Sequence, residues 1–382
     1  MLGGAAGVAL CVGGGHELTA PSPPRGPTAT AAATGSALAA PSRAPRAGRL
    51  PIIDAHVHLS PDGVEHLGKL MRRWGFDHVV NLSGSNPRRG LEEQLAAARK
   101  APGTITTFTT LAYAEVRAPG YGERMAKLLV MAHDAGARGL KIAKVLGLAL
   151  PGPNGELLPV DDPGLDPVFE KAGELGMPIA IHAGDPKKFW EPIDAKNERY
   201  DELAAHPGWA EYGKPVPSFD AILAALERRI ARHPKTTFIS VHFGNCAEDP
   251  ERVARQLRKY PNLYIDTAAR IPEMGRYPPE KMRAFFVEFQ DRILYGSDLG
   301  VGPEEEPLFL GSSGADAPTP REEELFFTAT HRYFETGDRK FEHPTPIQGR
   351  WKIDGIALPR DVLEKVYARN AMRLLGIVLP KD

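Results

Sequence analysis

The sequence predicts one (β/α)8 barrel, the TIM-barrel form of the α/β class, over residues 50–376. From Leu50 onward, short apolar runs alternate with longer segments of helical periodicity. A regular β-then-α alternation implies parallel strands joined by right-handed crossovers. Eight strand-like runs can be distinguished, which is the number that closes such a barrel, and roughly 330 residues suit a barrel with loop insertions.

The individual elements follow from local pattern. Strands are expected where apolar, β-branched or aromatic residues are bounded by turn residues, at 50–57, 78–83, 104–111, 139–143, 179–182, 236–242, 262–267 and 292–298. Helices are expected where apolar residues recur at helical spacing, as Leu67, Leu70 and Trp74 do. The expected helices are 63–75, 91–100, 121–135, 166–175, 219–233, 250–259, 279–289, 320–336 and 359–375.

The first 49 residues differ from the rest in composition. Residues 13–49 are rich in Ala, Pro, Thr, Ser and Gly, and such a segment buries too little apolar surface to offset its ordering entropy. We therefore expect 1–49 to be a disordered linker. Residues 8–11 only loosely resemble a bacterial lipoprotein cleavage box, because Leu10 is bulky and no basic stretch precedes it. The sequence is therefore compatible with a cytoplasmic location and with export or lipid anchoring in a bacterium.

Charge and cysteine content narrow the classes of partner. The formal net charge is −1, so the charge does not favour nucleic acid or an anionic membrane as a binding partner. No apolar run approaches the ~20 residues of a transmembrane helix. Two cysteines build neither a disulfide framework nor a thiolate cluster, so nitrogen and oxygen must hold any metal. A small-molecule substrate is expected, and a homodimer is compatible with the sequence.

Four histidines and one aspartate stand at the ends of predicted strands. His56 and His58 lie two residues apart in the first strand, so they share one face. His182, His242 and Asp298 each follow an apolar run and precede small or turn residues. In a closed barrel, the C-terminal ends of strands surround one mouth, where active sites lie. We therefore expect these five side chains to converge on one metal ion.

With these motifs the sequence resembles the amidohydrolase superfamily. Within it, the sequence is most similar to the amidohydrolase-related group that includes the aminocarboxymuconate semialdehyde decarboxylase type. The resemblance covers about 50–376 and implies a metal bound by His56, His58, His182 and Asp298, with His242 beside the metal-bound water. The matching pieces are Asp54-Ala55-His56-Val57-His58, Ile181-His182, Val241-His242 and Tyr295-Gly296-Ser297-Asp298.

The resemblance also implies one divalent ion, because the decarboxylase-like group is typically mononuclear. Imidazoles and a carboxylate with one open position suit Zn²⁺, and no ligand type excludes Mn²⁺. Lys141 lies on the fourth predicted strand, where two-metal members of the superfamily carry a carboxylated lysine. A second ion is expected if Lys141 is carboxylated. Otherwise Lys141 is a buried cation that pairs with a strand-end acid or contacts the substrate.

The expected reaction is hydrolysis of an amide, lactone or related carbonyl compound by a metal-activated water. Asp298 would take the water's proton and pass it to the leaving group, and His242 would hold the hydroxide in line or polarise the carbonyl. The alternative is non-oxidative decarboxylation of an aromatic or enoic acid, with Arg270 gripping a carboxylate. A third interpretation, a barrel that binds ligand without catalysis, is disfavoured by the intact ligand set.

A long connection follows the fifth predicted strand. Residues 184–217 carry Trp190, Trp209 and Tyr212. A loop of this length is more often functional than idle. These aromatic side chains either form a lid that excludes water or pack the loop itself, and the sequence favours neither.

Overall fold

The structure is a computed structural model that describes residues 49–311 and 317–379. Within these ranges, no helix combines the length and the hydropathy that a bilayer crossing requires. The predicted disordered linker at 1–49 lies, apart from Arg49, outside the described residues.

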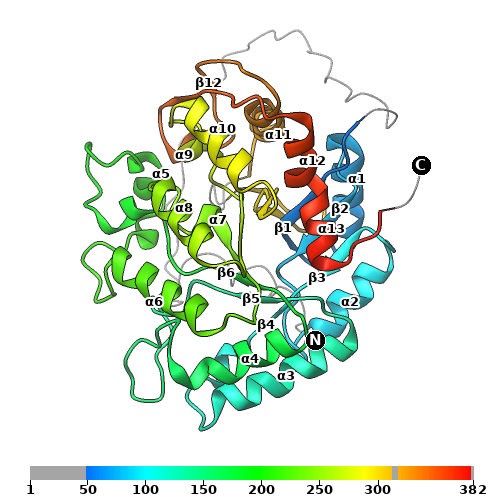
Figure 1. The fold of residues 1–382 in the computed structure, drawn as a ribbon, viewed down its shortest axis with the longest axis vertical. Helices are drawn as coiled ribbons and strands as arrows, with labels where there is room; N and C mark the ends of the chain where they lie inside the picture. The colour runs from blue at the N-terminus through cyan, green and yellow to red at the C-terminus, as the bar shows by residue number, and fades with distance from the viewer. Residues whose placement is uncertain (1–48, 312–316, 380–382) are drawn as a thin grey trace, which may run out of the picture.

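The strands form two main sheets (Figure 1), with the orders β11-β10-β1-β2-β3 and β4-β5-β6-β7-β8-β9. Neighbours are parallel except for the antiparallel pair of β10 and β11. The bounds are β1 (Ile53–Leu59), β2 (His78–Asn81), β3 (Ile105–Thr107), β4 (Thr109–Thr110), β5 (Leu140–Ile142), β6 (Ile179–Ile181), β7 (Phe238–Ser240), β8 (Leu263–Asp266), β9 (Ile293–Leu294), β10 (Leu299–Val301) and β11 (Phe309–Leu310).

Backbone hydrogen bonds connect the two sheets at both edges. At one edge, Phe108 separates β3 from β4: its N–H donates to Asn81 O on one side, and Thr109 N–H donates to Gly139 O on the other, both at 2.9 Å. At the opposite edge, Ala55 N–H donates to Tyr295 O at 2.9 Å. The third predicted strand is thus split into two short ones. The arrangement is that of a (β/α)8 barrel, as the sequence predicts.

Helices surround the strands (Figure 1), and each predicted helix is present. The described residues add short helices that the sequence did not predict, at Tyr200–Ala205, Val241–Gly244 and Ile271–Met274. The predicted helix at 359–375 contains a π-helical turn at Lys365–Arg369 between α12 and α13. The bounds are α1 (Val64–Trp74), α2 (Leu91–Arg99), α3 (Tyr121–Ala135), α4 (Asp166–Glu174), α5 (Tyr200–Ala205), α6 (Phe219–Arg232), α7 (Val241–Gly244), α8 (Pro250–Lys259), α9 (Ile271–Met274), α10 (Pro279–Glu288), α11 (Pro320–Glu335), α12 (Arg360–Glu364) and α13 (Asn370–Leu375).

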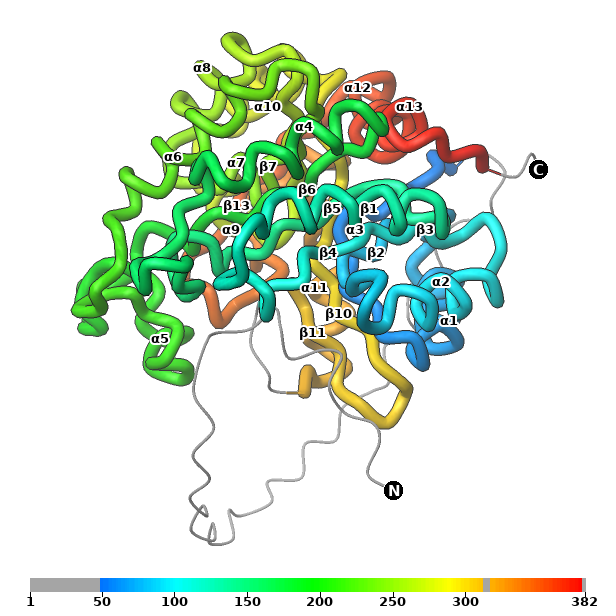
Figure 2. The backbone as a smooth tube through the Cα atoms, turned by 90° about the horizontal axis from the view of Figure 1, so that it is seen from below, coloured from blue at the N-terminus to red at the C-terminus, as the bar shows by residue number. Residues whose placement is uncertain are grey.

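Local chemistry explains where several helices begin and end. The Asp249 side chain accepts the N–H of Arg252, and Pro250 opens α8, a position where its missing N–H costs nothing. Helix α1 ends at Gly75, whose φ of 76° suits a residue without Cβ. A two-stranded hairpin, β12 (Phe341–Glu342) and β13 (Lys352–Ile353), lies against α9 (Figure 2), where Trp351 Nε1 donates to Pro272 O at 2.9 Å.

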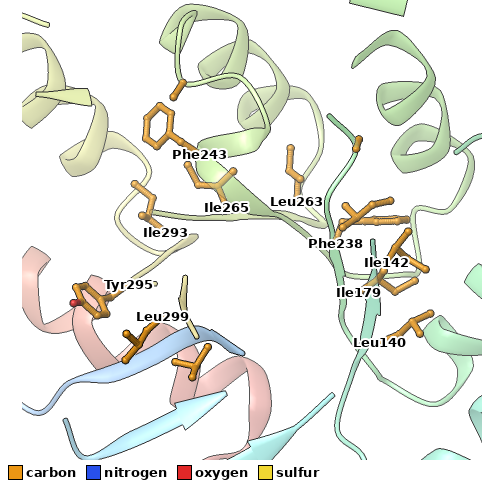
Figure 3. Packing of buried hydrophobic residues seen from close by; sticks show 14 of the residues in the cluster. Leu140, Ile142, Ile179, Phe238, Phe243, Leu263, Ile265, Ile293, Tyr295 and Leu299 are labelled. Carbon is orange, nitrogen blue, oxygen red and sulfur yellow. The ribbon is translucent and has the colours of Figure 1, made fainter. Parts of the chain in front are cut away.

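Side chains that alternate along the strands build two apolar clusters. Ile179, Phe238 and Ile293 belong to the larger cluster, which also contains the buried faces of the helices, and Figure 3 shows part of it. Ala180, Ile239 and Leu294, their chain neighbours, belong to a smaller cluster inside the barrel. Residues of α13 such as Ala371 join this inner cluster. Because the inner face is packed at this depth, polar side chains are left to the C-terminal ends of the strands.

Candidate metal centre

His56, His58 and Asp298 form the centre of the site. Both histidines lie on β1, and their Nε2 atoms approach the same oxygen, Asp298 Oδ1, at 3.1 Å and 3.2 Å. His56 is fully buried, whereas the side chain of His58 is 15 % exposed. One donor atom from each residue lies within 4.8 Å of the others, so the group could hold a metal ion.

Hydrogen bonds at the other ring nitrogens orient both imidazoles. His56 Nδ1 lies 2.8 Å from Asp266 Oδ2 at the end of β8. A carboxylate only accepts, so Nδ1 carries the proton and Nε2 carries the lone pair. His58 Nδ1 lies 2.7 Å from Ser83 Oγ, which can accept its proton in the same way. Such partners are typical of metal-binding histidines, because they fix the tautomer.

The resulting donor set fits a divalent cation. With the tautomers fixed in this way, two nitrogen lone pairs face one carboxylate oxygen, and these groups repel one another unless a cation or protons lie among them. Burial opposes ionisation of Asp298, yet protons on the facing nitrogens of His56 and His58, which a cation would replace, hold the pKa of its carboxyl well below the usual range. The carboxylate is therefore ready to act as a ligand.

A strained turn presents Asp298 to the histidines. Asp298 has a φ of 65°, which is uncommon for a residue other than glycine. Its N–H donates to His56 O at 2.9 Å. The preceding Ser297 donates both its N–H and its hydroxyl to the buried Asp54 carboxylate, which also accepts the N–H of His56. Asp54 thereby ties the Asp298 turn to β1, and burial raises its pKa to about 6.

His242 lies on the far side of His56, with their ring centroids 5.0 Å apart. Its N–H donates to Asp266 Oδ1 at 2.7 Å, and its Nδ1 donates to Ala268 O at 3.0 Å. Burial lowers the pKa of His242 well below the usual range. His242 is therefore a neutral ring with its lone pair on Nε2. With His56 and Asp266 it forms a second group that could hold a metal ion.

His182 follows β6 and packs beside His242, with a ring-centroid separation of 4.3 Å. Its Nε2 lies 2.9 Å from Gly184 O, an acceptor, so Nε2 carries the proton and Nδ1 has the lone pair. Burial, reinforced by His242 and Lys141, lowers the pKa of His182 well below the usual range. His182 thus stands next to the centre but belongs to neither compact donor group.

The sequence model of the amidohydrolase family matches residues 53–377, most of the chain. The chain belongs to the amidohydrolase family. This confirms the resemblance inferred from the strand-end motifs. No curated protein matches this amidohydrolase.

Solved structures resemble the amidohydrolase over most of its length. An uncharacterized TIM-barrel protein from Bordetella bronchiseptica is 16% identical, with 86% of this chain and 99% of that chain covered and a TM-score of 0.49. A putative amidohydrolase from Staphylococcus aureus is also 16% identical, with 86% of this chain and 100% of that chain covered and a TM-score of 0.49. The 2,6-dihydroxybenzoate decarboxylase from Rhizobium is 15% identical, with 86% of this chain and 99% of that chain covered and a TM-score of 0.47. These likenesses do not select a reaction.

The two cations expected near the site of the amidohydrolase are both buried. Lys141 points inward from β5, and its Nζ lies 3.4 Å from His56 Nε2. Arg270 is 6% exposed, and it donates to the carbonyl of its neighbour Ala269. Among the described residues, no carboxylate lies within 4.0 Å of the Arg270 guanidinium. Burial and the nearby Arg199 lower the pKa of Arg270.

Two buried glutamates near the rim of the barrel pair with Arg199. Arg199, only 1% exposed, donates to Glu202 at 2.8 Å and contacts Glu273 on α9. Both carboxylates are almost fully buried. Arg199 comes from the long 184–217 connection, so its ion pairs hold that segment to the rim of the barrel.

The aromatic side chains of the 184–217 connection do not gather over the centre. Trp190 packs against Phe219, with ring centroids 5.6 Å apart, and donates to Pro217 O. Trp209 stacks on His206 at 4.1 Å, and Tyr212 is 56% exposed. Trp190 thus packs against the start of α6, and Trp209 packs within the connection itself.

Sequence reasoning did not assign roles to Asp54, Ser83 and Asp266. Asp54 and Asp266 are fully buried beside the histidines. Both accept hydrogen bonds from His56, and Asp266 also accepts one from His242, so the two aspartates orient these histidines. A signal was available: each aspartate directly follows at least three apolar residues of a predicted strand, and an ionisable residue is seldom buried at such a place without a partner. Ser83 carries no such signal, because serine is common after strands.

Proposed function

We propose that this chain is a metal-dependent hydrolase that acts on an amide, lactone or related carbonyl bond of a small molecule. The observation that carries the proposal is the convergence of His56 Nε2, His58 Nε2 and Asp298 Oδ1 within about one coordination sphere. His182 would add a fourth donor through Nδ1. Nitrogen and oxygen donors of this kind suit one divalent ion, with Zn²⁺ the best match.

When bound, the ion would polarise the substrate carbonyl and make water nucleophilic near neutral pH. The protein's own part is to move and hold protons. In the proposed reaction Asp298 accepts the proton of the attacking water and returns it to the leaving group. His242 has its Nδ1 proton committed to Ala268 O, so its Nε2 accepts a hydrogen bond from the water and holds it in line.

Two buried cations would bind the substrate. Arg270 has a guanidinium fork that makes no ion pair with a carboxylate of the described residues, and such a fork matches a substrate carboxylate bidentately. Lys141 approaches His56 Nε2 from inside the barrel, where it would contact a substrate oxygen. If Lys141 is instead carboxylated, it would supply the bridge for a second ion.

Arg270 also favours one alternative reaction. A guanidinium available for a carboxylate beside a Lewis-acid site suits non-oxidative decarboxylation of an aromatic or enoic acid. Formation of CO2 from such acids by the metal-loaded protein, without cleavage of any ester, lactone or amide, would select this carboxy-lyase. Stoichiometric metal binding without turnover in either panel would instead select a ligand-binding barrel.

The test is metal removal combined with one substitution. Chelated protein should lose turnover on the active substrate and recover it with Zn²⁺ or Mn²⁺. Asp298→Asn keeps the size of the side chain but removes the base, so kcat should fall about 10²- to 10⁴-fold. Asp161→Asn is the matched control, because Asp161 pairs with Arg228 on the outer surface. Full activity of the chelated protein or of Asp298→Asn would contradict the proposal.

A further inference from the structure

His182 and His242 come from different strands yet pack ring against ring, with centroids 4.3 Å apart. The ladder between β6 and β7 ends at the pair Ile181 and Ser240. Each histidine lies beyond that pair, so the hydrogen bonds between β6 and β7 do not fix the distance between the two, although His182 N–H still donates to Ile142 O of β5 at 3.0 Å. Another group must hold the two chain segments together at this point.

Beyond Ser240, the chain leaves the sheet in a left-handed turn. The φ angles of His242, Phe243, Gly244 and Asn245 are 55°, 54°, 72° and 56°. Only glycine adopts this region freely, and asparagine tolerates it better than most other residues. Several such residues in succession persist only where the surroundings hold them. The turn removes the β7 backbone from the position where it would have continued to pair with β6.

The side chain of Asn245 fills that position. Its Oδ1 accepts the N–H of Ala183 at 2.9 Å, and its Nδ2 donates to Ile181 O at 3.2 Å. Nδ2 also donates to Ser240 Oγ at 2.8 Å. Ile181 and Ala183 flank His182, so one buried carboxamide grips the backbone on both sides of that histidine. It therefore replaces the peptide group that a longer β7 would have supplied.

We propose that Asn245 is a positioning residue, which fixes His182 against His242 through these hydrogen bonds. The inference rests on the proposed metal centre, because it assigns Asn245 the task of pre-arranging two of its imidazoles. Asn245 closes the left-handed turn that carries His242 and also clamps the strand end that carries His182. One side chain thus sets the distance between the two.

The test compares the removal of two asparagine side chains. Asn245→Gly removes the carboxamide but keeps a residue that adopts positive φ without strain. The control is Asn262→Gly, at the start of β8, where Nδ2 donates to the carbonyls of His233 and Thr236. Both changes remove an amide that joins backbone segments, but Asn262 lies at the opposite end of the barrel.

The measurements are the Co²⁺ affinity of the metal-free protein, by competition titration, and the visible absorption spectrum of bound Co²⁺. In Asn245→Gly the Kd for Co²⁺ should rise about 10- to 100-fold, and the spectrum should change. Asn245→Asp guards against a folding defect. It changes a single heavy atom, yet its second oxygen faces Ile181 O, so affinity should fall here too. Asn262→Gly should lower the Tm and leave affinity and spectrum unchanged.

The remaining outcomes overturn the inference in distinguishable ways. If the wild-type protein does not bind Co²⁺, the proposed function fails and the inference fails with it. If the wild type binds Co²⁺ and both Asn245 variants match it in Kd and spectrum, only the positioning role is overturned. Equal loss of affinity in Asn245→Gly and Asn262→Gly also overturns that role, because the effect would then be general destabilisation.

Discussion

At the scale of single residues, the site depends on carboxylates that hold other groups in place. Asp54 accepts hydrogen bonds from Ser297 and from the N–H of His56, and Asp266 accepts from His56 and His242. The histidines could be predicted from the sequence, because their place at strand ends is a pattern. The pairing of these carboxylates could not, because the hydrogen bonds from Ser297 to Asp54 and from His56 to Asp266 join segments more than 200 residues apart, and a buried aspartate in a strand does not show which group it accepts from.

A residue-scale prediction concerns Arg270. Arg270→Met should lower kcat/KM for a substrate that carries a carboxylate about 10- to 100-fold, because a charge-assisted hydrogen bond contributes about 1.5–3 kcal/mol. A neutral analogue of the same substrate should be affected little. Steady-state kinetics on the matched pair of substrates tests this.

The control for Arg270 is Arg276→Met. Arg276 pairs with Glu198 at 2.8 Å, and its side chain is 39% exposed, so its loss should leave both substrates unaffected. An equal loss of kcat/KM for the charged and the neutral substrate in Arg270→Met would speak against carboxylate recognition.

At the scale of elements, periodicity located the main strands and helices, but it missed the short elements such as β10 and β11 and the interruptions of the longer ones. The third predicted strand is broken at Phe108, where the chain passes from one sheet to the other. The last helix contains a π-helical turn at Lys365–Arg369, where Val366 O accepts the N–H of Tyr295. Both irregularities serve contacts between distant segments. A local pattern of apolar residues cannot report such contacts.

The segment between β12 and β13 yields a prediction on pH. His343 is buried, with Nε2 2.9 Å from Gly349 O and Nδ1 3.4 Å from Thr345 N. Burial lowers its pKa from 6.5 to about 4. Between these values the unfolded chain binds a proton that the native state does not, so stability falls as pH falls. The stability that arises from the lowered pKa of His343 is therefore fully present above about pH 6.5 and is lost as the pH falls toward 4.

Comparison with His343→Asn isolates the effect. The wild type should exceed the variant in free energy of unfolding at pH 7.5, and the difference should shrink by about 2 kcal/mol at pH 5. Urea unfolding at the two pH values provides the measurement. His133→Asn, on the exposed side of α3, is the control. A difference for His343→Asn that does not change with pH would refute the argument.

At the scale of the whole molecule, the barrel depends on how its two sheets meet. Phe108 is fully buried at the junction of β3 and β4, and its ring lies against Gly139. A Cβ at Gly139 would come within 2.3 Å of Phe108 Cζ. The glycine therefore makes room for the ring. The sequence predicts eight strands here, but it does not show which residue joins the sheets.

Phe108→Ala should therefore lower the free energy of unfolding by about 3–5 kcal/mol, the usual cost of removing a buried aromatic ring. Gly139→Ala should also destabilise the protein. The double variant should lose less than the sum of the two single losses, because the smaller residue leaves space for the new methyl group. Chemical denaturation measures all three.

Val378→Ala, at a position that is 82% exposed, is the control and should change stability by less than about 0.5 kcal/mol. Strictly additive losses at 108 and 139 would mean that the two residues do not share this space.

The docking of the C-terminal helices on β9 has a consequence for biosynthesis. Strand β9, which leads into the turn of Asp298, is held by two residues of this C-terminal region. Val366 O accepts the N–H of Tyr295, and Asn370 Nδ2 donates to Ile293 O at 2.8 Å. A nascent chain that has left the ribosome only as far as Asp298 already contains all the side chains of the centre. It still lacks these two anchors. This amidohydrolase should therefore acquire the geometry of its centre only after α12 and α13 have left the ribosome.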